Sequence, residues 1–419
     1  RLSGKWRNNP AFAGGAALTT RDGRLVTLVD GRVDELRAED EALVMLCALT
    51  LRAGESRTLW VKRPYDLPAT EGGRLAGVSG EQLLQQAEES WEILWKRGIR
   101  LDLPDKVLED FFYSSLAYTI ILTEYDEAGD LLVIGGPTHY RHFWLRSEYP
   151  AALALNAGGF PDIALLTTRY VLKVQRDDGR WDMPLLTAPA AWDAFGDAAG
   201  TLWSCYLFNG DKRWLRTVYP HLAKAARWIK AVRQQTMLPP GAPPASKPVA
   251  PYFTQCMSSP MVPLSDGEGP YEYGLMPKGY GDGGLPDDYS FVHNFKSLYA
   301  VDCARLAAVE LDESADAARL ADEYKDFKEA ILTAVARSVR LEKDGPPYLP
   351  AAVTYPEAPF WGTLRAVFPV GIFSPRDPLV EGLLIRMQRM SRQGLPLNMG
   401  WLGRGGLWPG QSMEVAQVY

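Results

Sequence analysis

The sequence predicts a mainly α-helical protein in which paired helices form a double ring, an (α/α)6 toroid preceded by the end of a β-sandwich. Apolar residues recur with helical spacing from about residue 104 to the end of the chain. Amphipathic segments alternate there with segments that are apolar on most sides, as expected for outer and inner helices. Before residue 66, short apolar runs alternate with a period of two, which is typical of strands.

The first 65 residues are expected to form the C-terminal part of a β-sandwich domain. Residues 24–29 lie between glycine-containing turns and predict one strand. Apolar side chains alternate over 43–51, and a turn leads from there into 58–61, which predicts a hairpin between these two segments. Because so few strands are not stable alone, we expect them to complete a larger sandwich.

Residues 66–103 are expected to be a linker with a helix, and residues 104–419 to be the barrel. Roughly ten helices can be counted where a closed ring needs about twelve, so we expect the last hairpin to be absent. Apolar residues of the amphipathic helices span Val107 to Leu122, Ile163 to Val174, Trp214 to Ile229, Phe291 to Val309, Leu320 to Val335 and Leu379 to Met390. The inner segments are 143–157, 194–208, 360–372 and one that starts at Leu407.

Long loops are predicted to gather at one end of this ring. Connections from outer to inner helices are long and rich in Gly, Pro, Trp and charged residues, whereas the return at 209–211 is short. The longest connection, 236–288, is of the kind that usually carries function. The chain has 13 Trp and 19 Tyr residues, many of them in these loops. Flat exposed rings in a concave site suit the C–H faces of sugars.

Composition narrows the classes of partner and cofactor. The formal charge of −6 is spread without basic blocks, so neither nucleic acid nor an anionic membrane is expected as a partner. The four cysteines show no CxxC spacing, and the HxxH formed by His139 and His142 has no third ligand nearby, so no metal site is predicted. Phosphate-loop and dinucleotide motifs are absent from the sequence, and no cofactor is expected.

A soluble protein is expected because no run of about 18 apolar residues occurs. The chain begins at Arg1 without an initiator Met and without a signal-peptide pattern. Both a cytoplasmic location and a secreted or periplasmic one with the signal removed therefore stay open.

Four passages carry a resemblance to a known group of enzymes: 142–146 (His-Phe-Trp-Leu-Arg), 175–181 (Gln-Arg-Asp-Asp-Gly-Arg-Trp), 210–228 and 274–293. They resemble the six-hairpin glycosidases, which include glucoamylases, trehalases, processing α-glucosidases, α-L-rhamnosidases and disaccharide phosphorylases. The resemblance covers the chain from about residue 40 and points to the superfamily rather than to one member. It implies an enzyme that acts on an oligosaccharide or glycoconjugate.

Glycoside hydrolysis requires two carboxyl groups at one site, a general acid and a second group that activates water or attacks carbon. The resemblance places the acid in the loop before the sixth helix of the ring. We favour Asp282 there, because flanking glycines allow close approach of the substrate, and Glu272 is the alternative. The same glycine-rich sequence around Asp282 would also be expected of a surface turn without a catalytic role. In glucoamylase-like members the second carboxylate precedes the twelfth helix, and by the count of helices we expect that loop to lie beyond Tyr419. Glu357 and Glu414 are the late candidates inside the chain, although the helical spacing of Glu414 favours a solvated or capping role.

Candidate substrate-binding residues fall mostly at the predicted starts of the inner helices. Many relatives carry Arg-Asp before the second helix, where this chain has Arg146-Ser147-Glu148, so Glu148 is expected to take the place of the Asp. Each candidate would also suit packing or helix capping, and their common location is what favours binding. The candidates are Trp144, Arg146, Glu148, Trp181, Trp192, Asp193, Tyr280, Trp361, Trp401, Arg404 and Trp408.

These observations together predict an inverting glycoside hydrolase that removes a terminal sugar. A polysaccharide lyase or a disaccharide phosphorylase on the same toroid is the second hypothesis, since residues 139–142 (His-Tyr-Arg-His) could face a uronate carboxylate. A non-catalytic carbohydrate-binding protein is the third. An absent last hairpin would call for a homo-oligomer or for a second chain that supplies the missing elements.

Overall fold

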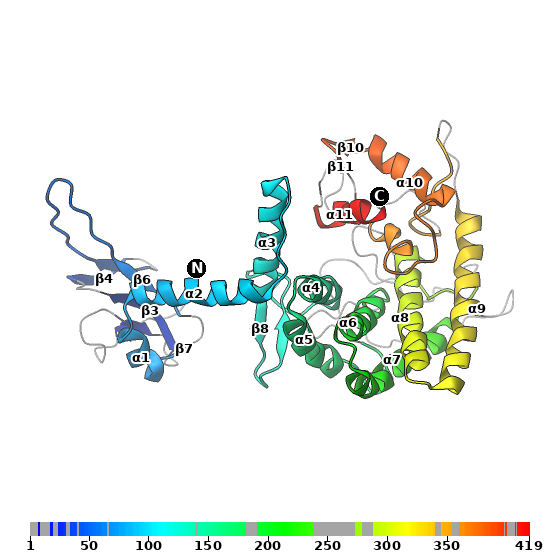
Figure 1. The fold of residues 1–419 in the computed structure, drawn as a ribbon, viewed down its shortest axis with the longest axis horizontal. Coiled ribbons are helices and arrows are strands. Elements are labelled where there is room, and N and C mark those ends of the chain that lie inside the picture. Colours follow the sequence, from blue (N-terminus) through cyan, green and yellow to red (C-terminus); the bar gives the residue numbers. More distant parts are fainter. Residues whose placement is uncertain are drawn as a thin grey trace. The chain divides into compact units, whose positions relative to one another are not determined.

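A computed structural model provides the structure of the chain, whose contacts divide it into two compact units, residues 1–98 and residues 99–419 (Figure 1). We call them the N-terminal unit and the helical unit. The structure is mainly helical, and none of its described helices is long and apolar enough to cross a membrane. The described residues are 7–8, 17–19, 24–30, 34–39, 42–64, 67–138, 141–181, 191–237, 273–278, 288–339, 345–353, 360–397, 399, 407 and 409–419.

The described residues of the N-terminal unit form a small antiparallel sheet, the α-helices α1 and α2 and the short 3-10 helix η1. Its sheet has the order β1-β2-β3-β6, with β7 also paired to β3, while β4 and β5 form a separate hairpin. Leu25 and Leu28 of β3 are buried against Leu75, and Ser79 begins α2 with a capping box that includes Gln82. The bounds are β1 Arg7–Asn8, β2 Ala17–Thr19, β3 Arg24–Asp30, β4 Glu35–Glu39, β5 Ala42–Leu46, β6 Trp60–Lys62, β7 Leu67–Pro68, η1 Ala69–Glu71, α1 Gly72–Ala76 and α2 Gly80–Arg97.

The predicted strand at 24–29 is confirmed as β3, but the predicted hairpin between 43–51 and 58–61 is wrong. β5 pairs with β4, with Leu46 opposite Glu35, and β6 pairs with β3. Only two residues separate β4 from β5, the connection length that favours a hairpin, whereas β5 and β6 lie much farther apart along the chain. Alternation of apolar and polar residues predicts a strand, but it does not show with which other strand that strand will pair.

The helical unit begins with α3 and ends with α11. Its helices start where the sequence offers capping side chains: the carboxylates of Asp105, Asp211 and Asp377 accept hydrogen bonds from the first turns of α3, α7 and α10. The bounds are α3 Lys106–Ile121, β8 Thr123–Tyr125, β9 Leu131–Val133, α4 Leu145–Ala157, α5 Pro161–Lys173, α6 Ala194–Asn209, α7 Lys212–Arg233, α8 Phe291–Glu310, α9 Ser314–Ser338, η3 Thr363–Ala366, α10 Pro378–Arg389, β10 Ser391–Arg392, β11 Leu395–Pro396 and α11 Pro409–Val418.

Two rows of helices build most of this unit. α4, α6 and α8 are consecutive neighbours, and α5, α7 and α9 pack beside them, so that each helix of the second row contacts one or two of the first (Figure 1). Glycines permit the close contact within the first row. A Cβ atom at Gly196 of α6 would lie 2.5 Å from the backbone oxygen of Lys296 in α8, and one at Gly200 would lie 2.8 Å from the ring of Tyr299.

Two predictions about individual segments are corrected by the structure. The pattern from Phe291 to Val309 predicted an amphipathic outer helix, yet α8 is buried almost throughout its first 14 residues. Its polar side chains are paired inside the protein, so that they do not mark a solvent face. The segment 360–372 was expected to be an inner helix, but only η3 is helical, because Gly362 and Gly371 have positive φ angles and Pro369 lacks the N–H that a helix needs.

The orientation predicted for α3 is also wrong. Val107, Phe111 and Tyr118 were expected to face the core, but their exposed fractions are 76%, 58% and 67%. The packed face of α3 is the opposite one, where Leu116 is buried and meets Gly158 at the end of α4. Both faces of this helix are apolar, so periodicity could not select the buried one.

Candidate functional site

The first turns of the helices α4, α6 and α8 bring charged side chains together. Arg146 in the first turn of α4 donates two hydrogen bonds to the carboxylate of Asp193, which precedes α6, and the bond from Nη2 to Oδ1 measures 2.8 Å. His293 of α8 places Nε2 3.4 Å from the same Oδ1. Asp193 is completely buried. Burial acts to raise the pKa of Asp193, but Arg146 and His293 outweigh it and hold that pKa well below its usual range.

A second buried pair lies one helical turn farther along α6 and α8. Lys296 Nζ is 2.7 Å from Oδ1 and 2.6 Å from Oδ2 of Asp197, and both side chains are almost fully buried. Burial raises the pKa of Asp197 to about 6, although Lys296 acts in the opposite direction. The charge of Asp193 contributes to the same increase, so the two carboxyl groups are electrostatically coupled.

A third pair comes from the C-terminal part of the chain. Arg365 of η3 donates from Nε to Glu414 of α11 over 2.9 Å. Glu414 also interacts with Lys296, and Arg365 with Asp197, so this pair joins the other two electrostatically. The solvated role predicted for Glu414 is wrong, because its side chain is 4% exposed and accepts a hydrogen bond from the largely enclosed guanidinium of Arg365. We call the seven residues the central charge cluster: Arg146, Asp193, Asp197, His293, Lys296, Arg365 and Glu414.

Tryptophan side chains adjoin the central charge cluster. The guanidinium carbon of Arg146 lies 5.2 Å from the ring centroid of Trp361, a cation–π contact. Trp192 donates from Nε1 to the carbonyl oxygen of Pro277 over 2.9 Å. Trp144, which immediately precedes α4, packs against His142 with ring centroids 4.8 Å apart. Three predicted binding residues, Trp144, Trp192 and Trp361, therefore lie close in sequence or space to Arg146 and Asp193.

The structure places two other predicted residues away from the cluster. Glu148 follows Arg146 by two residues, so it leaves α4 in a different direction and meets Thr167 of α5 and the backbone of Val133. Trp181 donates from Nε1 to the carbonyl oxygen of Val171 and is 4% exposed. Both positions have the surroundings of core residues, and a contact with substrate stays a prediction for them.

The remaining predicted site residues lie outside the described part of the chain. They are Asp282, Glu272, Glu357, Tyr280, Trp401, Arg404 and Trp408. The segment 279–287, which holds Asp282, lies between described residues on both sides. On one side Pro277 accepts from Trp192 and Met276 N donates to Asn294 of α8 over 2.8 Å. On the other side Asp288 leads directly into α8.

Four members of the cluster were missed by the sequence analysis: Asp197, His293, Lys296 and Arg365. A usable signal was present in α8, where His293, Asn294, Lys296 and Ser297 interrupt an otherwise apolar run. Charged residues in a helix that is apolar on most sides must find partners inside the protein, because burial of an unpaired charge is costly. No comparable signal singles out Arg365, whose place depends on contacts with distant segments.

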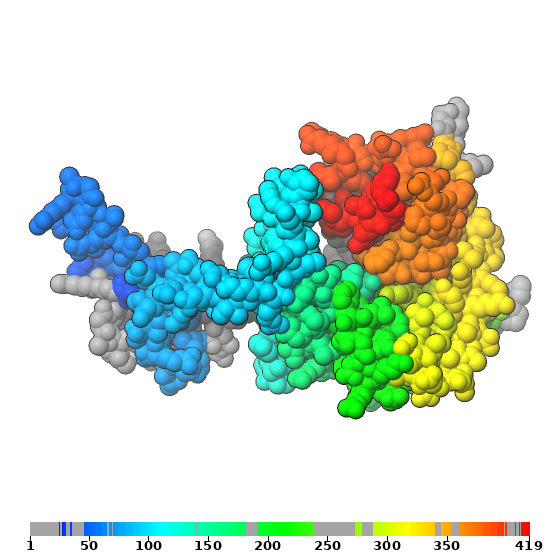
Figure 2. Space-filling view, viewed as in Figure 1, coloured from blue at the N-terminus to red at the C-terminus, as the bar shows by residue number. Residues whose placement is uncertain are grey.

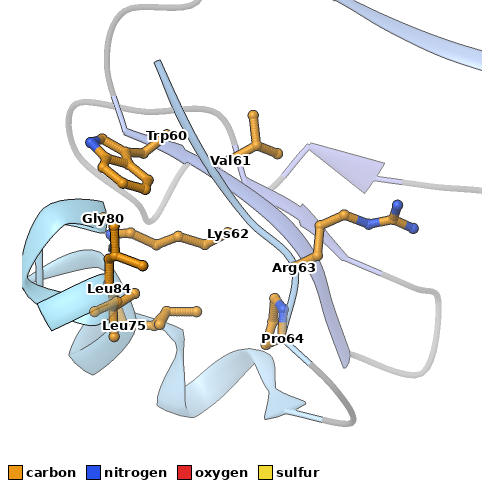
Figure 3. Close-up of a pocket in the computed structure, with 9 residues that line it drawn as sticks. Trp60, Val61, Lys62, Arg63, Pro64, Leu75, Gly80 and Leu84 are labelled. Atoms are coloured by element: carbon orange, nitrogen blue, oxygen red, sulfur yellow. Dashed lines mark hydrogen bonds between the residues drawn. The ribbon is translucent and has the colours of Figure 1, made fainter. Parts of the chain in front are cut away.

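The described residues contain no group of three or more His, Cys, Asp or Glu side chains that could hold a metal ion. In the N-terminal unit they line an open cavity of about 330 Å³, with Trp60, Lys62, Leu75 and Leu84 at its walls (Figure 3). The ammonium of Lys62 is already bound to Asp30 and to the carbonyl oxygen of Leu75. The residues that line this cavity include no carboxylate or nucleophile, so the central charge cluster is the better candidate for chemistry.

No protein-family model matches the sequence, and no curated protein is significantly similar to it. The function must therefore be inferred from the chain's own residues and geometry.

Proposed function

We propose that this chain is a glycoside hydrolase whose helical unit is an (α/α)6-type toroid and whose N-terminal strands end a β-sandwich. The observation that carries the proposal is the central charge cluster. Segments as distant in sequence as Arg146 and Glu414 contribute to one group of charges whose carboxylates are buried. The charges would converge in this way if the inner helices all turned the same end toward a common centre. Tryptophan side chains lie next to the cluster, which suits a sugar-binding site.

The chemistry of the cluster suits a neutral polyhydroxyl substrate. Asp193 remains ionised because Arg146 and His293 stabilise its charge, and from its buried position it would hold the Arg146 guanidinium in place for a sugar hydroxyl. Arg146 and Lys296 offer donors, and the acids and bases of the cluster are nearly equal in number. Trp361, which is itself buried, packs its ring against the Arg146 guanidinium and helps to fix its position. In this proposal the cluster positions the sugar and does not break the bond.

Asp282 is the proposed general acid. It lies in the segment 279–287, whose flanking residues are tied to Trp192 and to α8, the helix that carries His293. The carboxyl group of Asp282 would protonate the glycosidic oxygen while a second carboxylate activates water on the opposite face of the sugar, as in inverting enzymes. Glu272 is the alternative acid, and Glu357 is the candidate base.

A panel of aryl glycosides tests the proposal. Wild type and the variants Asp282→Asn, Glu272→Gln and Glu357→Gln are compared with Glu329→Gln, a change of an exposed acid on α9. Loss of a general acid is expected to lower kcat/KM about 10²–10⁴-fold. For Asp282→Asn the loss should be largest with poor leaving groups and small with dinitrophenyl glycosides, because a good leaving group needs no proton.

Other outcomes would decide against the assignment. Near-wild-type activity of Asp282→Asn on poor leaving groups would remove Asp282 as the acid. An unsaturated product that absorbs in the ultraviolet would identify a lyase, and strict dependence on phosphate would identify a phosphorylase. Saturable sugar binding without turnover across the panel would identify a carbohydrate-binding protein.

A further inference from the structure

Arg233 is a buried charged side chain outside the central charge cluster. It ends α7 and is completely buried against α9, which lies at the surface of the helical unit, in yellow in Figure 2. Its guanidinium faces the ring of Phe327, with Cζ 4.0 Å from the ring centroid. Nη1 donates to Glu323, and Nη2 donates to Asp326 over 2.8 Å. Two carboxylates of α9 therefore already balance the charge of Arg233 and join it to that helix.

A further hydrogen bond of Arg233 leads out of this pair of helices. Nε donates to the carbonyl oxygen of Gly274 over 2.7 Å, although the two residues are 41 positions apart in sequence. Gly274 has a φ of +76°, and a Cβ atom there would lie 3.0 Å from the Cβ of Ala330 in α9. Because a guanidinium is planar and donates in several fixed directions, one side chain can hold α9 and a remote backbone segment at the same time.

Thr236 binds the next residue of the same segment. Its Oγ1 lies 2.7 Å from the carbonyl oxygen of Leu275 and 2.7 Å from that of Arg233, and its side chain is buried. Two consecutive carbonyl groups therefore meet side chains from the end of α7. The next two residues, Met276 and Pro277, are bound from α8 and from just before α6. Four residues in a row are held in this way.

We infer that Arg233 and Thr236 are positioning residues for the general acid. The inference rests on the proposed function, in which Asp282 is that acid. We call the two residues the α7 clasp, because together they fix the chain shortly before the segment 279–287. A catalytic group must be held within about 0.5 Å of its productive position. Misplacement by about 1 Å can lower the rate about 100-fold.

The chemistry of the α7 clasp favours positioning over stability alone. Replacing a buried ion pair by apolar side chains of similar size is often neutral or stabilising, so stability by itself does not call for Arg233. Apolar side chains at 233 and 236 would leave two carbonyl oxygens without donors. Hydrogen bonds from a charged donor are short and directional, so Arg233 specifies where Gly274 lies.

Kinetics of the full chain on aryl glycosides test the positioning role. Thr236→Val replaces the hydroxyl by a methyl group, whereas Thr236→Ser retains the hydroxyl. We expect Thr236→Val to lower kcat about tenfold with phenyl glycosides and less than about twofold with dinitrophenyl glycosides, because only the poor leaving group needs a proton. Thr236→Ser should stay within about twofold of wild type on both.

Two more variants complete the comparison. Arg233→Lys keeps a charge beside the carboxylates of α9, but an ammonium cannot also hold Gly274 in the geometry of the guanidinium, so the same dependence on leaving group is expected. Thr168→Val is the matched control. Thr168 is a buried threonine of α5 whose hydroxyl donates to Leu165 of its own helix, and its replacement should leave kcat unchanged on both classes of glycoside.

Hydrogen exchange followed by mass spectrometry examines the α7 clasp without substrate. Peptides that cover 274–278 should exchange at least about tenfold faster in Thr236→Val than in wild type, and at the wild-type rate in Thr168→Val. Unchanged exchange in Thr236→Val would overturn the clasp. Faster exchange with an equal loss of kcat on both classes of glycoside, or with no loss, would show that the clasp only stabilises the fold. If wild type cleaves no glycoside, the proposed function fails and the positioning role with it, while the exchange rates still show whether the clasp holds the segment.

Discussion

Lys296 of α8 and Asp197 of α6 form a buried ion pair at the contact between these two neighbouring helices, with Nζ within 2.7 Å of both carboxylate oxygens. Each residue lies one helical turn beyond a member of the Arg146–Asp193–His293 group. The pair therefore joins the charges at the helix starts to the interior of the unit. The ion pair therefore contributes both to the packing of α6 against α8 and to the electrostatics of the candidate site.

Removing one member of this pair should destabilise the helical unit strongly. Lys296→Met leaves the carboxylate of Asp197 buried without its partner, which is expected to cost about 3–5 kcal/mol, whereas the double change Asp197→Leu with Lys296→Met should recover much of this loss. Denaturant unfolding measures both. Lys325→Met on the exposed side of α9 is the control and should cost less than about 0.5 kcal/mol. Equal unfolding free energies for Lys296→Met and the control would show that the pair is not buried as described.

The pH dependence of stability should contain a contribution from Glu148. Burial raises its pKa to about 8 from an ordinary value of 4.5. Between these values the folded chain keeps a proton that the unfolded chain loses, so this contribution to stability falls as pH rises from about 4.5 to 8. Glu148→Gln cannot lose a proton, and its Tm should decrease less from pH 5 to pH 8 than that of wild type, when measured by circular dichroism. The exposed Glu329→Gln should follow wild type, and parallel curves for all three proteins would refute the buried, protonated Glu148.

Close helix packing at Gly196 should not tolerate a methyl group. A Cβ there would lie 2.5 Å from the backbone oxygen of Lys296, and backbone cannot rotate away as a side chain can. Gly196→Ala is expected to cost about 1–3 kcal/mol. Gly73→Ala, in α1 with nothing within 4 Å, should be neutral or stabilise by up to about 1 kcal/mol. Thermal unfolding compares the two, and a similar Tm for both variants would contradict the close α6–α8 contact.

The hydrogen bond from Trp192 to Pro277 should matter for turnover under the proposed function. Trp192→Phe keeps an aromatic ring but removes the donor that holds the chain just before the segment of Asp282. We expect kcat to fall about tenfold or more with little change in KM, because misplacement of a catalytic group affects the chemical step. Trp214→Phe on α7 is the control. Unchanged kcat in Trp192→Phe would separate this hydrogen bond from catalysis.

Local signals accounted for the helices that the sequence predicted correctly. The pattern from Trp214 to Ile229 and the capping Asp211 lie within one stretch of chain, and α7 follows them closely. The strand at 24–29 was recognised for the same reason. Spacing and capping act between residues that are near in sequence, so they can be detected without knowledge of the fold.

The candidate site was only half accessible from the sequence. Arg146, Asp193 and Trp361 were expected near the starts of inner helices, and the structure brings them together. Lys296 and Arg365 were not anticipated, because nothing close to them in sequence shows which distant carboxylate they will meet. The same limit applies to Glu414, whose partner Arg365 is 49 residues away in the chain.

The sequence by itself determined where most of the helices lie, as in α5, α7 and α9, and which side chains are available for chemistry. Only the tertiary structure decided that β5 pairs with β4, that α8 is enclosed, that α3 leaves Val107 and Tyr118 exposed, and that three ion pairs converge. The physical reason is that the local sequence shows that an apolar face must be buried or that a charged side chain must be paired. It does not show which distant segment will cover that face or pair with that charge, because contacts between remote segments decide this during folding.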